Sequence, residues 1–188
     1  RAGAPGLPER VPAHRFVVHM SFSSIEVAIE TIRSGKALIV VDAEDRENEG
    51  DFICAAEKIT PEMVNFMVKR GGGVFCVTLR PDRARALELN PASSRNTALQ
   101  KTAFTESVDL RSGTTGVSAS ERAETTRALA SDRTLPQDLA RPGHVYPIVA
   151  QEGGVLRRAG HTEASVDLAE LAAELVDDVA NAAAAHAD

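Results

Sequence analysis

Five of the eight residues in the segment 44–51 carry a carboxylate: Glu44, Asp45, Glu47, Glu49 and Asp51. Like charges at this density repel and raise one another's pKa, so they persist together only where cations, protons or backbone donors compensate. Carboxylate oxygens favour a hard divalent ion such as Mg²⁺ or Mn²⁺ over zinc. The segment is therefore a candidate metal or substrate site.

A solvated acidic turn is the alternative explanation, because most runs of charge lie on protein surfaces. Two features favour a site. The run follows an apolar stretch, residues 37–41, and α/β proteins commonly bind ligands at the ends of buried strands. It also contains Gly50, which permits close backbone approach or a positive φ. Arg46, among the acids, is expected to hold the loop in place or to contact a substrate oxygen.

A second group of candidates combines histidine, arginine and hydroxyl side chains. His144 and His161 each follow a glycine in an arginine-containing segment, which suggests side chains held open towards a ligand, although a single histidine is most often structural. Residues 113–119 form a glycine-flanked, hydroxyl-rich loop that either offers N–H groups to an anion or is an ordinary capped turn. His161 and Thr162 open the last predicted helix, where a phosphate would meet N-terminal amides.

The composition narrows the classes of partner. A formal charge of −6 over 188 residues disfavours nucleic acid, because its binders need a basic face. A small anion needs only a local cluster, which Arg141, Arg157 and Arg158 would supply. No apolar run approaches the roughly 18 residues that span a bilayer, and no signal sequence is recognised. We expect a cytoplasmic protein with Cys54 and Cys76 reduced.

The elements that must position these side chains alternate between strand and helix. Strands are predicted at 37–41, 52–55, 74–79, 102–108 and 145–149. Helices are predicted after the Ser23–Glu26 capping spacing, from Thr60-Pro61, at 82–89, after the Ser118–Glu121 spacing, and from about Thr162. This order predicts one α/β layered domain over residues 20–188, with helices on a mixed sheet. Residues 1–19 are expected to be a flexible extension.

At residues 40–51, VVDAEDRENEGD, and 55–57, the chain resembles the 3,4-dihydroxy-2-butanone 4-phosphate synthase family. Segments 102–105, 113–119, 141–144 and 157–163 extend the match from about residue 22 to 172 in the same order. The resemblance implies the fold of that family, a homodimer, and a Mg²⁺-dependent or Mn²⁺-dependent conversion of ribulose 5-phosphate to 3,4-dihydroxy-2-butanone 4-phosphate and formate.

The resemblance also implies residue roles. Glu47 and His161 would hold the metal, and Arg46, Glu47 and Asp51 would contact the sugar phosphate. Asp51 or Glu49 would act as base, while Cys76 and His144 would transfer protons. The remaining implied substrate contacts are Thr105, Thr115, Arg158, Gly160, His161 and Thr162, of which Arg158 and Thr162 would anchor the phosphate.

The chain departs from the family beyond Ala172, where the family continues with a turn and a strand that ends in an essential Glu. Here Ala182 stands at the equivalent spacing, and the Ala-rich tail is expected to extend or follow the last helix. Asp177 or Asp178 would be the nearest substitute carboxylates. Three functions remain open: the full reaction, a related enolisation, dehydration or isomerisation without formate release, and a non-catalytic binding subunit. Glu106 and Glu121 are smaller departures, in place of an apolar residue and an Asp.

Overall fold

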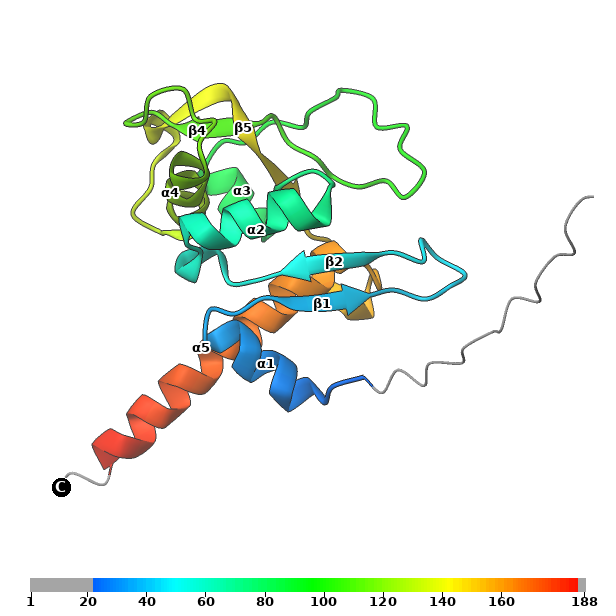
Figure 1. Ribbon diagram of the computed structural model, residues 1–188, viewed down its shortest axis with the longest axis vertical. Helices are drawn as coiled ribbons and strands as arrows, with labels where there is room; N and C mark the ends of the chain where they lie inside the picture. Colours follow the sequence, from blue (N-terminus) through cyan, green and yellow to red (C-terminus); the bar gives the residue numbers. More distant parts are fainter. Residues whose placement is uncertain (1–21, 186–188) are drawn as a thin grey trace, which may run out of the picture.

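The structure is a computed structural model that describes residues 22–185, with side chains described as far as Glu174. The expected extension at residues 1–19 lies outside this range. The helices are α1 (Ile25–Arg33), α2 (Pro61–Gly71), α3 (Pro81–Ala86), α4 (Ala119–Ala130) and α5 (His161–Ala185). Short 3-10 turns are η1 (Ala56–Lys58), η2 (Pro136–Asp138) and η3 (Gly154–Leu156). The strands are β1 (Leu38–Val41), β2 (Gly50–Ile53), β3 (Cys76–Leu79), β4 (Val108–Leu110) and β5 (Leu139–Val149) (Figure 1).

Side-chain caps start three of the helices. The Thr60 hydroxyl accepts the Met63 N–H at 3.2 Å at the start of α2, and Ser118 and Glu121 form the predicted capping box of α4. The first helix differs from its prediction, because Ser24 and not Ser23 is the N-cap residue and accepts from the Val27 N–H. The helix therefore begins one residue later than the Ser23–Glu26 spacing suggested.

The strands form two separate sheets. β1 and β2 pair as an antiparallel hairpin, with Leu38 opposite Ile53 and Val41 opposite Gly50. β5 is the centre of a three-stranded mixed sheet, parallel to β3 and antiparallel to β4. The predicted α/β class is confirmed, whereas the single mixed sheet is divided into these two parts.

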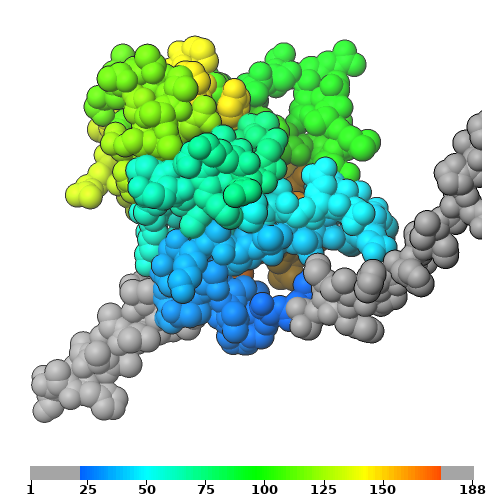
Figure 2. Space-filling model, in the orientation of Figure 1, coloured from blue at the N-terminus to red at the C-terminus, as the bar shows by residue number. Residues whose placement is uncertain are grey.

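Helices enclose the hairpin on two sides. In Figure 1 the β1–β2 hairpin lies between α2 on one side and α1 with α5 on the other. Ile29 and Ile32 of α1 pack with Ile53 of β2 and with Leu168 and Ala172 of α5. Figure 2 shows α2 lying over the hairpin, and the segment 92–103 standing out from the body beside the β1–β2 turn. The apolar core thus fixes α5, whose first residue is His161, beside the hairpin.

A cavity of about 500 Å³ separates the two sheets, between β2 and β3. Because the Asp42 N–H donates to the Glu49 carbonyl at 3.3 Å, strand alternation directs the peptide groups of Asp51 and Ile53 towards β1. Those of Phe52 are consequently directed towards the cavity. Side chains of α2 and α5 line the same space, together with Asp51, Cys76 and His161. The facing edges of the two sheets therefore border the same cavity as these candidate site residues.

Several predicted boundaries were wrong. The predicted strand 102–108 is mostly irregular: Phe104 and Thr105 form only isolated bridges, and β4 starts at Val108. β5 is longer than the predicted strand 145–149, because it begins at Leu139 and includes Pro142. An irregularity in the β4–β5 ladder between Val108 and Asp109 accommodates the extra residues of β5. β2 begins two residues before its predicted start, and α3 ends at Ala86.

The Ala-rich tail was expected to extend or follow the last helix, and α5 does continue as one helix to Ala185. In the described part of the chain, no helix is both long enough and apolar enough to cross a membrane.

Candidate active site and metal-binding cluster

Asp42 organises the acidic turn that follows β1. Its Oδ2 atom accepts the Glu47 N–H at 3.1 Å and the Arg46 guanidinium at 2.6 Å, and its Oδ1 atom accepts the Glu49 N–H at 2.9 Å. These donors lower the pKa of Asp42 to about 2, the Glu49 N–H contributing most. Asp42 was not among the predicted site residues, although its place directly after the strand was a signal for it. The turn is therefore held by one ionised carboxylate at its base.

Glu47 and His161 meet across the molecule, although 113 residues separate them in the sequence. The His161 Nδ1 atom lies 3.7 Å from Glu47 Oε2 and 3.8 Å from Asp51 Oδ2. One ligand atom each from Asp42, Glu47 and His161 lie within 4.8 Å of one another. The packing of α5 against the hairpin brings these groups together.

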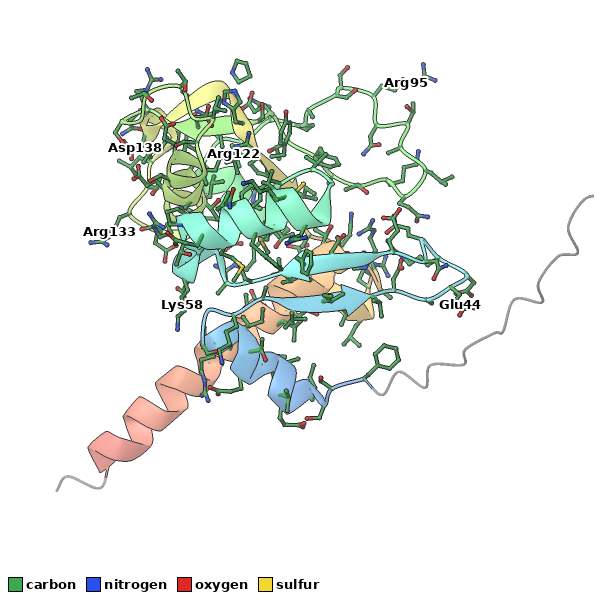
Figure 3. All side chains as sticks on the ribbon, viewed as in Figure 1. Glu44, Lys58, Arg95, Arg122, Arg133 and Asp138 are labelled. Carbon is green, nitrogen blue, oxygen red and sulfur yellow. The ribbon has the colours of Figure 1, made fainter. Side chains whose placement is uncertain are left out.

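This cluster fits a divalent cation. Carboxylate oxygens suit Mg²⁺ or Mn²⁺, and an imidazole is a common further ligand of divalent cations. His161 is only 8% exposed, and its Nε2 atom is buried without a hydrogen-bond partner among the described residues. A buried ring nitrogen without a partner is costly unless something else satisfies it. Glu44, by contrast, is exposed and points outward at the tip of the turn, as Figure 3 shows. For that carboxylate the alternative of a solvated acidic turn is therefore correct.

Two guanidinium groups flank the cluster at Gly160. A Cβ atom at this position would lie 2.6 Å from Nη1 of Arg158 and 3.0 Å from Nη2 of Arg46, so a side chain here would require the Arg158 guanidinium to move. Arg158 donates to Glu163 at 2.7 Å, and Glu163 is 1% exposed. Glu163 also accepts the Gln151 N–H at 2.9 Å. Sequence reasoning missed this buried carboxylate, which fixes Arg158 beside the Asp42–Glu47–His161 cluster.

Cys76 and Thr162 line the cavity next to this cluster. Burial, with the negative charge of Asp51, raises the pKa of the Cys76 thiol to about 12. Burial alone raises the pKa of Cys54 to about 11. Both thiols are consequently neutral at physiological pH, and both cysteines are free. Cys76 is placed to donate a proton more readily than to attack as a thiolate.

His144 lies apart from the Asp42–Glu47–His161 cluster, in a second hollow. This hollow shares its residues 73–75 with the lining of the first cavity, so the two are neighbours. The His144 Nδ1 atom is 2.7 Å from Asp109 Oδ2. Thr105 lines the same hollow but its hydroxyl is directed to the backbone, within 3.2 Å of the Pro147 carbonyl.

The loop 113–118 is held by its own helix. Glu121 accepts the Thr114 hydroxyl at 2.7 Å and the N–H groups of Thr114 and Gly116 at 2.7 and 3.1 Å. The Thr114 hydroxyl contributes most, followed by these N–H groups and the Ser118 hydroxyl, and together they lower the pKa of Glu121 to about 2. Both N–H groups donate to Glu121 and are not free to bind an anion. Of the two alternatives for this loop, the ordinary capped turn therefore fits better than the anion site. The side chains of Thr115 and Glu49 are exposed, and neither belongs to the Asp42–Glu47–His161 cluster.

Arg141 was predicted to contribute to an anion cluster, and that prediction was wrong. Its guanidinium donates to Glu106 at 3.0 Å and to the carbonyl groups of Leu87, Pro136 and Leu139. Glu106 is therefore its structural partner. Arg157 is exposed. The side chains of Asp177, Asp178 and Ala182 lie outside the described range.

Comparison with known proteins identifies the family of the chain. The family model for 3,4-dihydroxy-2-butanone 4-phosphate synthase matches residues 26–180. A riboflavin biosynthesis protein RibBA of Parabacteroides distasonis is 58% identical over 155 residues, covering 81% of this chain and 38% of that protein. A probable bifunctional riboflavin biosynthesis protein, RIBA 1, of Oryza sativa subsp. japonica is 55% identical over 168 residues, covering 84% of this chain and 31% of its own length. The chain thus spans less than two fifths of these relatives.

Solved structures give the same result. A 3,4-dihydroxy-2-butanone 4-phosphate synthase in complex with two magnesium ions has a TM-score of 0.79 and 44% identity, over 81% of this chain and 71% of that chain. A cation-free form of such a synthase has a TM-score of 0.75 and 42% identity, with the same coverage. The sequence match, the shared fold and the identity over most of the described chain agree. The chain belongs to the 3,4-dihydroxy-2-butanone 4-phosphate synthase family.

Proposed function

We propose that this chain converts D-ribulose 5-phosphate to 3,4-dihydroxy-2-butanone 4-phosphate and formate with Mg²⁺, or Mn²⁺ in its place, as a lyase of riboflavin biosynthesis. The observation that carries the proposal is the approach of His161 to Glu47 within 3.7 Å, beside the guanidinium groups of Arg46 and Arg158. The names of its relatives, which place those proteins in riboflavin biosynthesis, support the same pathway.

Glu47 and His161 are the proposed metal ligands, and Asp42 is a third possible donor. When bound, the ion supplies Lewis-acid polarisation of the substrate ketone and the neighbouring hydroxyl groups. Arg158 and Thr162 are the proposed phosphate anchors, because a guanidinium and the start of a long helix both favour an anion. Gly160 keeps the space between the two arginines open. Arg46, which bonds both Asp42 and Glu47, is placed to contact the sugar.

The proposed proton-transfer groups are side chains in and near the cavity. Asp51 is the proposed base, because it is exposed and lies within 3.8 Å of the His161 ring, and Glu49 is its alternative. Cys76, whose neutral thiol lines the cavity, is a proposed proton donor. His144 is a proposed second proton-transfer group. Thr105 and Thr115 remain proposed substrate contacts, with less support for Thr105 because its hydroxyl is directed to the backbone.

A related reaction without formate release is the second candidate. It is favoured by the uninterrupted helix α5, which runs to Ala185 where the family is expected to continue with a strand bearing an essential Glu. Enolisation, dehydration or isomerisation of a pentulose phosphate would still use the metal and arginine groups. A non-catalytic binding subunit is the third candidate.

Carbon NMR of labelled ribulose 5-phosphate with protein and Mg²⁺ distinguishes these functions, because the products identify the reaction. Formate and the four-carbon phosphate support the first, a new five-carbon species the second, and a metal-dependent thermal shift without turnover the third. Glu47→Gln should abolish turnover while the protein stays folded, whereas Glu44→Gln, a change at the exposed tip of the same turn, should not. Full activity of Glu47→Gln would refute the metal assignment.

We further propose a cytoplasmic homodimer, folded as one domain over residues 20–188, that binds neither nucleic acid nor membranes. Three apolar or aromatic side chains at the hollow that holds His144 support a covered face: Val74, Phe104 and Tyr146 are each at least 36% exposed. The free cysteines agree with a reducing compartment. Light scattering on the purified chain tests the dimer, and a monomer mass at micromolar concentration would contradict it.

A further inference from the structure

Asp109 contacts His144 at two points. Its Oδ1 atom accepts the His144 backbone N–H at 2.9 Å, while its Oδ2 atom lies 2.7 Å from the ring atom Nδ1. The Asp109 side chain is 13% exposed and the His144 side chain 43%. One carboxylate therefore fixes both the backbone and the ring, while the rest of the imidazole lines the second hollow.

The surrounding chain makes room for this pair. Gly116 has a φ of 76°, and a Cβ atom there would overlap the Asp109 carboxylate. A Cβ atom at Gly143 would overlap the backbone of Val108. The irregular β4–β5 register between Val108 and Asp109 brings the segment before Val145 alongside Asp109, and Ser107 accepts the Gly143 N–H at 3.1 Å. Gly116, Gly143 and the irregular β4–β5 register thus together allow the contact between Asp109 and His144.

The contact determines which ring nitrogen carries hydrogen. An ionised carboxylate can only accept hydrogen bonds, so Nδ1 of a neutral His144 must be the protonated nitrogen. Nε2 is then an unprotonated acceptor. His144 lines the second hollow with Thr105, Arg122 and Tyr146, so a ligand there would meet an imidazole of fixed tautomer.

We propose that Asp109 is a positioning residue that holds His144 in the Nδ1–H tautomer, so that Nε2 accepts a proton from the substrate. Its catalytic part rests on the proposed function; its structural part does not. In the proton transfer, Nε2 gains the substrate proton, Nδ1 keeps its own, and the imidazolium formed remains paired with the Asp109 carboxylate.

The substitution Asp109→Asn preserves the size of the side chain but reverses this preference. If its Oδ1 atom continues to accept the His144 backbone N–H, its amide group must face Nδ1, which then becomes an acceptor. Ring ¹⁵N NMR of the neutral imidazole, with the signal assigned through His144→Gln, should show Nδ1–H in the unaltered chain and Nε2–H in the variant. An Nε2–H signal in the unaltered chain would overturn the proposal even if the variant did not fold.

Ser107→Ala is the matched control, because it removes a hydrogen bond from the same turn without touching the ring. It should leave the tautomer unchanged; a tautomer change in this variant would show that general loosening of the turn, and not Asp109, sets the proton.

Turnover provides the second readout. Asp109→Asn should lower kcat by about 10²- to 10⁴-fold, as loss of the tautomer does in other His–Asp pairs. The Michaelis constant should change less than about threefold, because Asp109 acts through His144 and not on the substrate. A reversed tautomer with unchanged kcat would refute the catalytic part. If the unaltered chain does not turn over ribulose 5-phosphate, the proposed function fails while the ¹⁵N result still decides the tautomer.

Discussion

The Nδ1 atom of His161 lies 3.7 Å from the Oε2 atom of Glu47, although one residue opens helix α5 and the other lies in the turn between β1 and β2. Everything proposed about the metal depends on this approach. It follows from the packing of α5 and α1 around the hairpin, since Leu168 and Ala172 contact Ile53 of β2. The position of His161 next to Glu47 therefore depends on the packing of this apolar core.

Replacing Asp42 should weaken the metal site without unfolding the protein. Asp42→Asn loses charge at the group that holds Arg46 and the N–H groups of Glu47 and Glu49. Mn²⁺ affinity, followed by electron paramagnetic resonance, should fall by about 10- to 100-fold, as is usual when a carboxylate that supports or joins a metal site is lost. Asp45→Asn, in the same turn at an exposed position, should bind Mn²⁺ normally. Equal affinity of the two variants would contradict the role of Asp42.

Loss of the Glu163 carboxylate should affect stability and substrate binding together. Glu163→Gln weakens a buried acceptor of Arg158 and of the Gln151 N–H, at a cost on the order of 1–3 kcal/mol in the free energy of unfolding. Urea denaturation measures this change. The Michaelis constant should also rise, because Arg158 would no longer be fixed. Glu174→Gln, an exposed change on the same helix, should leave both quantities unchanged. A normal Michaelis constant for Glu163→Gln would exclude Arg158 as a phosphate anchor.

Acid should loosen the loop 113–118 through Glu121. The pKa of Glu121 is lowered from 4.5 to about 2 by its donors, so its contribution to stability is present above about pH 4.5 and disappears as the pH falls towards 2. Glu121→Gln should remove this part of the acid dependence, seen as a flatter plot of melting temperature against pH. The pKa of Asp42 is also lowered, from 3.8 to about 2, so the part of the acid dependence that comes from Asp42 should remain in Glu121→Gln. Superimposable plots for both proteins would show that the loop is not held by this charge.

Neither cysteine should react readily in the folded, metal-free protein. With pKa values of about 11 and 12, the thiolate fraction at pH 8 is on the order of 1 in 1,000 for Cys54 and 1 in 10,000 for Cys76. Alkylation by iodoacetamide in the presence of EDTA should be far slower than in urea, where both thiols return to ordinary values. Rapid alkylation of Cys76 in the folded state would show a thiolate and would remove it as a proton donor.

The sequence by itself determined the helix starts that depend on local chemistry. The Thr60 cap of α2 and the Ser118–Glu121 capping box were predicted, because a cap involves residues three apart in the chain. The family could also be identified from the order of its short motifs. Strand limits were less accurate, since they depend on distant partners: β4 begins at Val108, where the predicted strand 102–108 ended.

Only the tertiary structure decided which candidates meet. The family resemblance had implied that Glu47 and His161 share a metal ion. The tertiary structure added Asp42 to that pair, turned Arg141 towards backbone carbonyl groups and Glu106, and revealed Asp109 and Glu163 as the partners of His144 and Arg158. Residue type shows what a side chain is able to do, but its hydrogen-bond partner depends on which segments pack together. That packing is set by burial of apolar residues far apart in the chain, and no local pattern in the sequence records it.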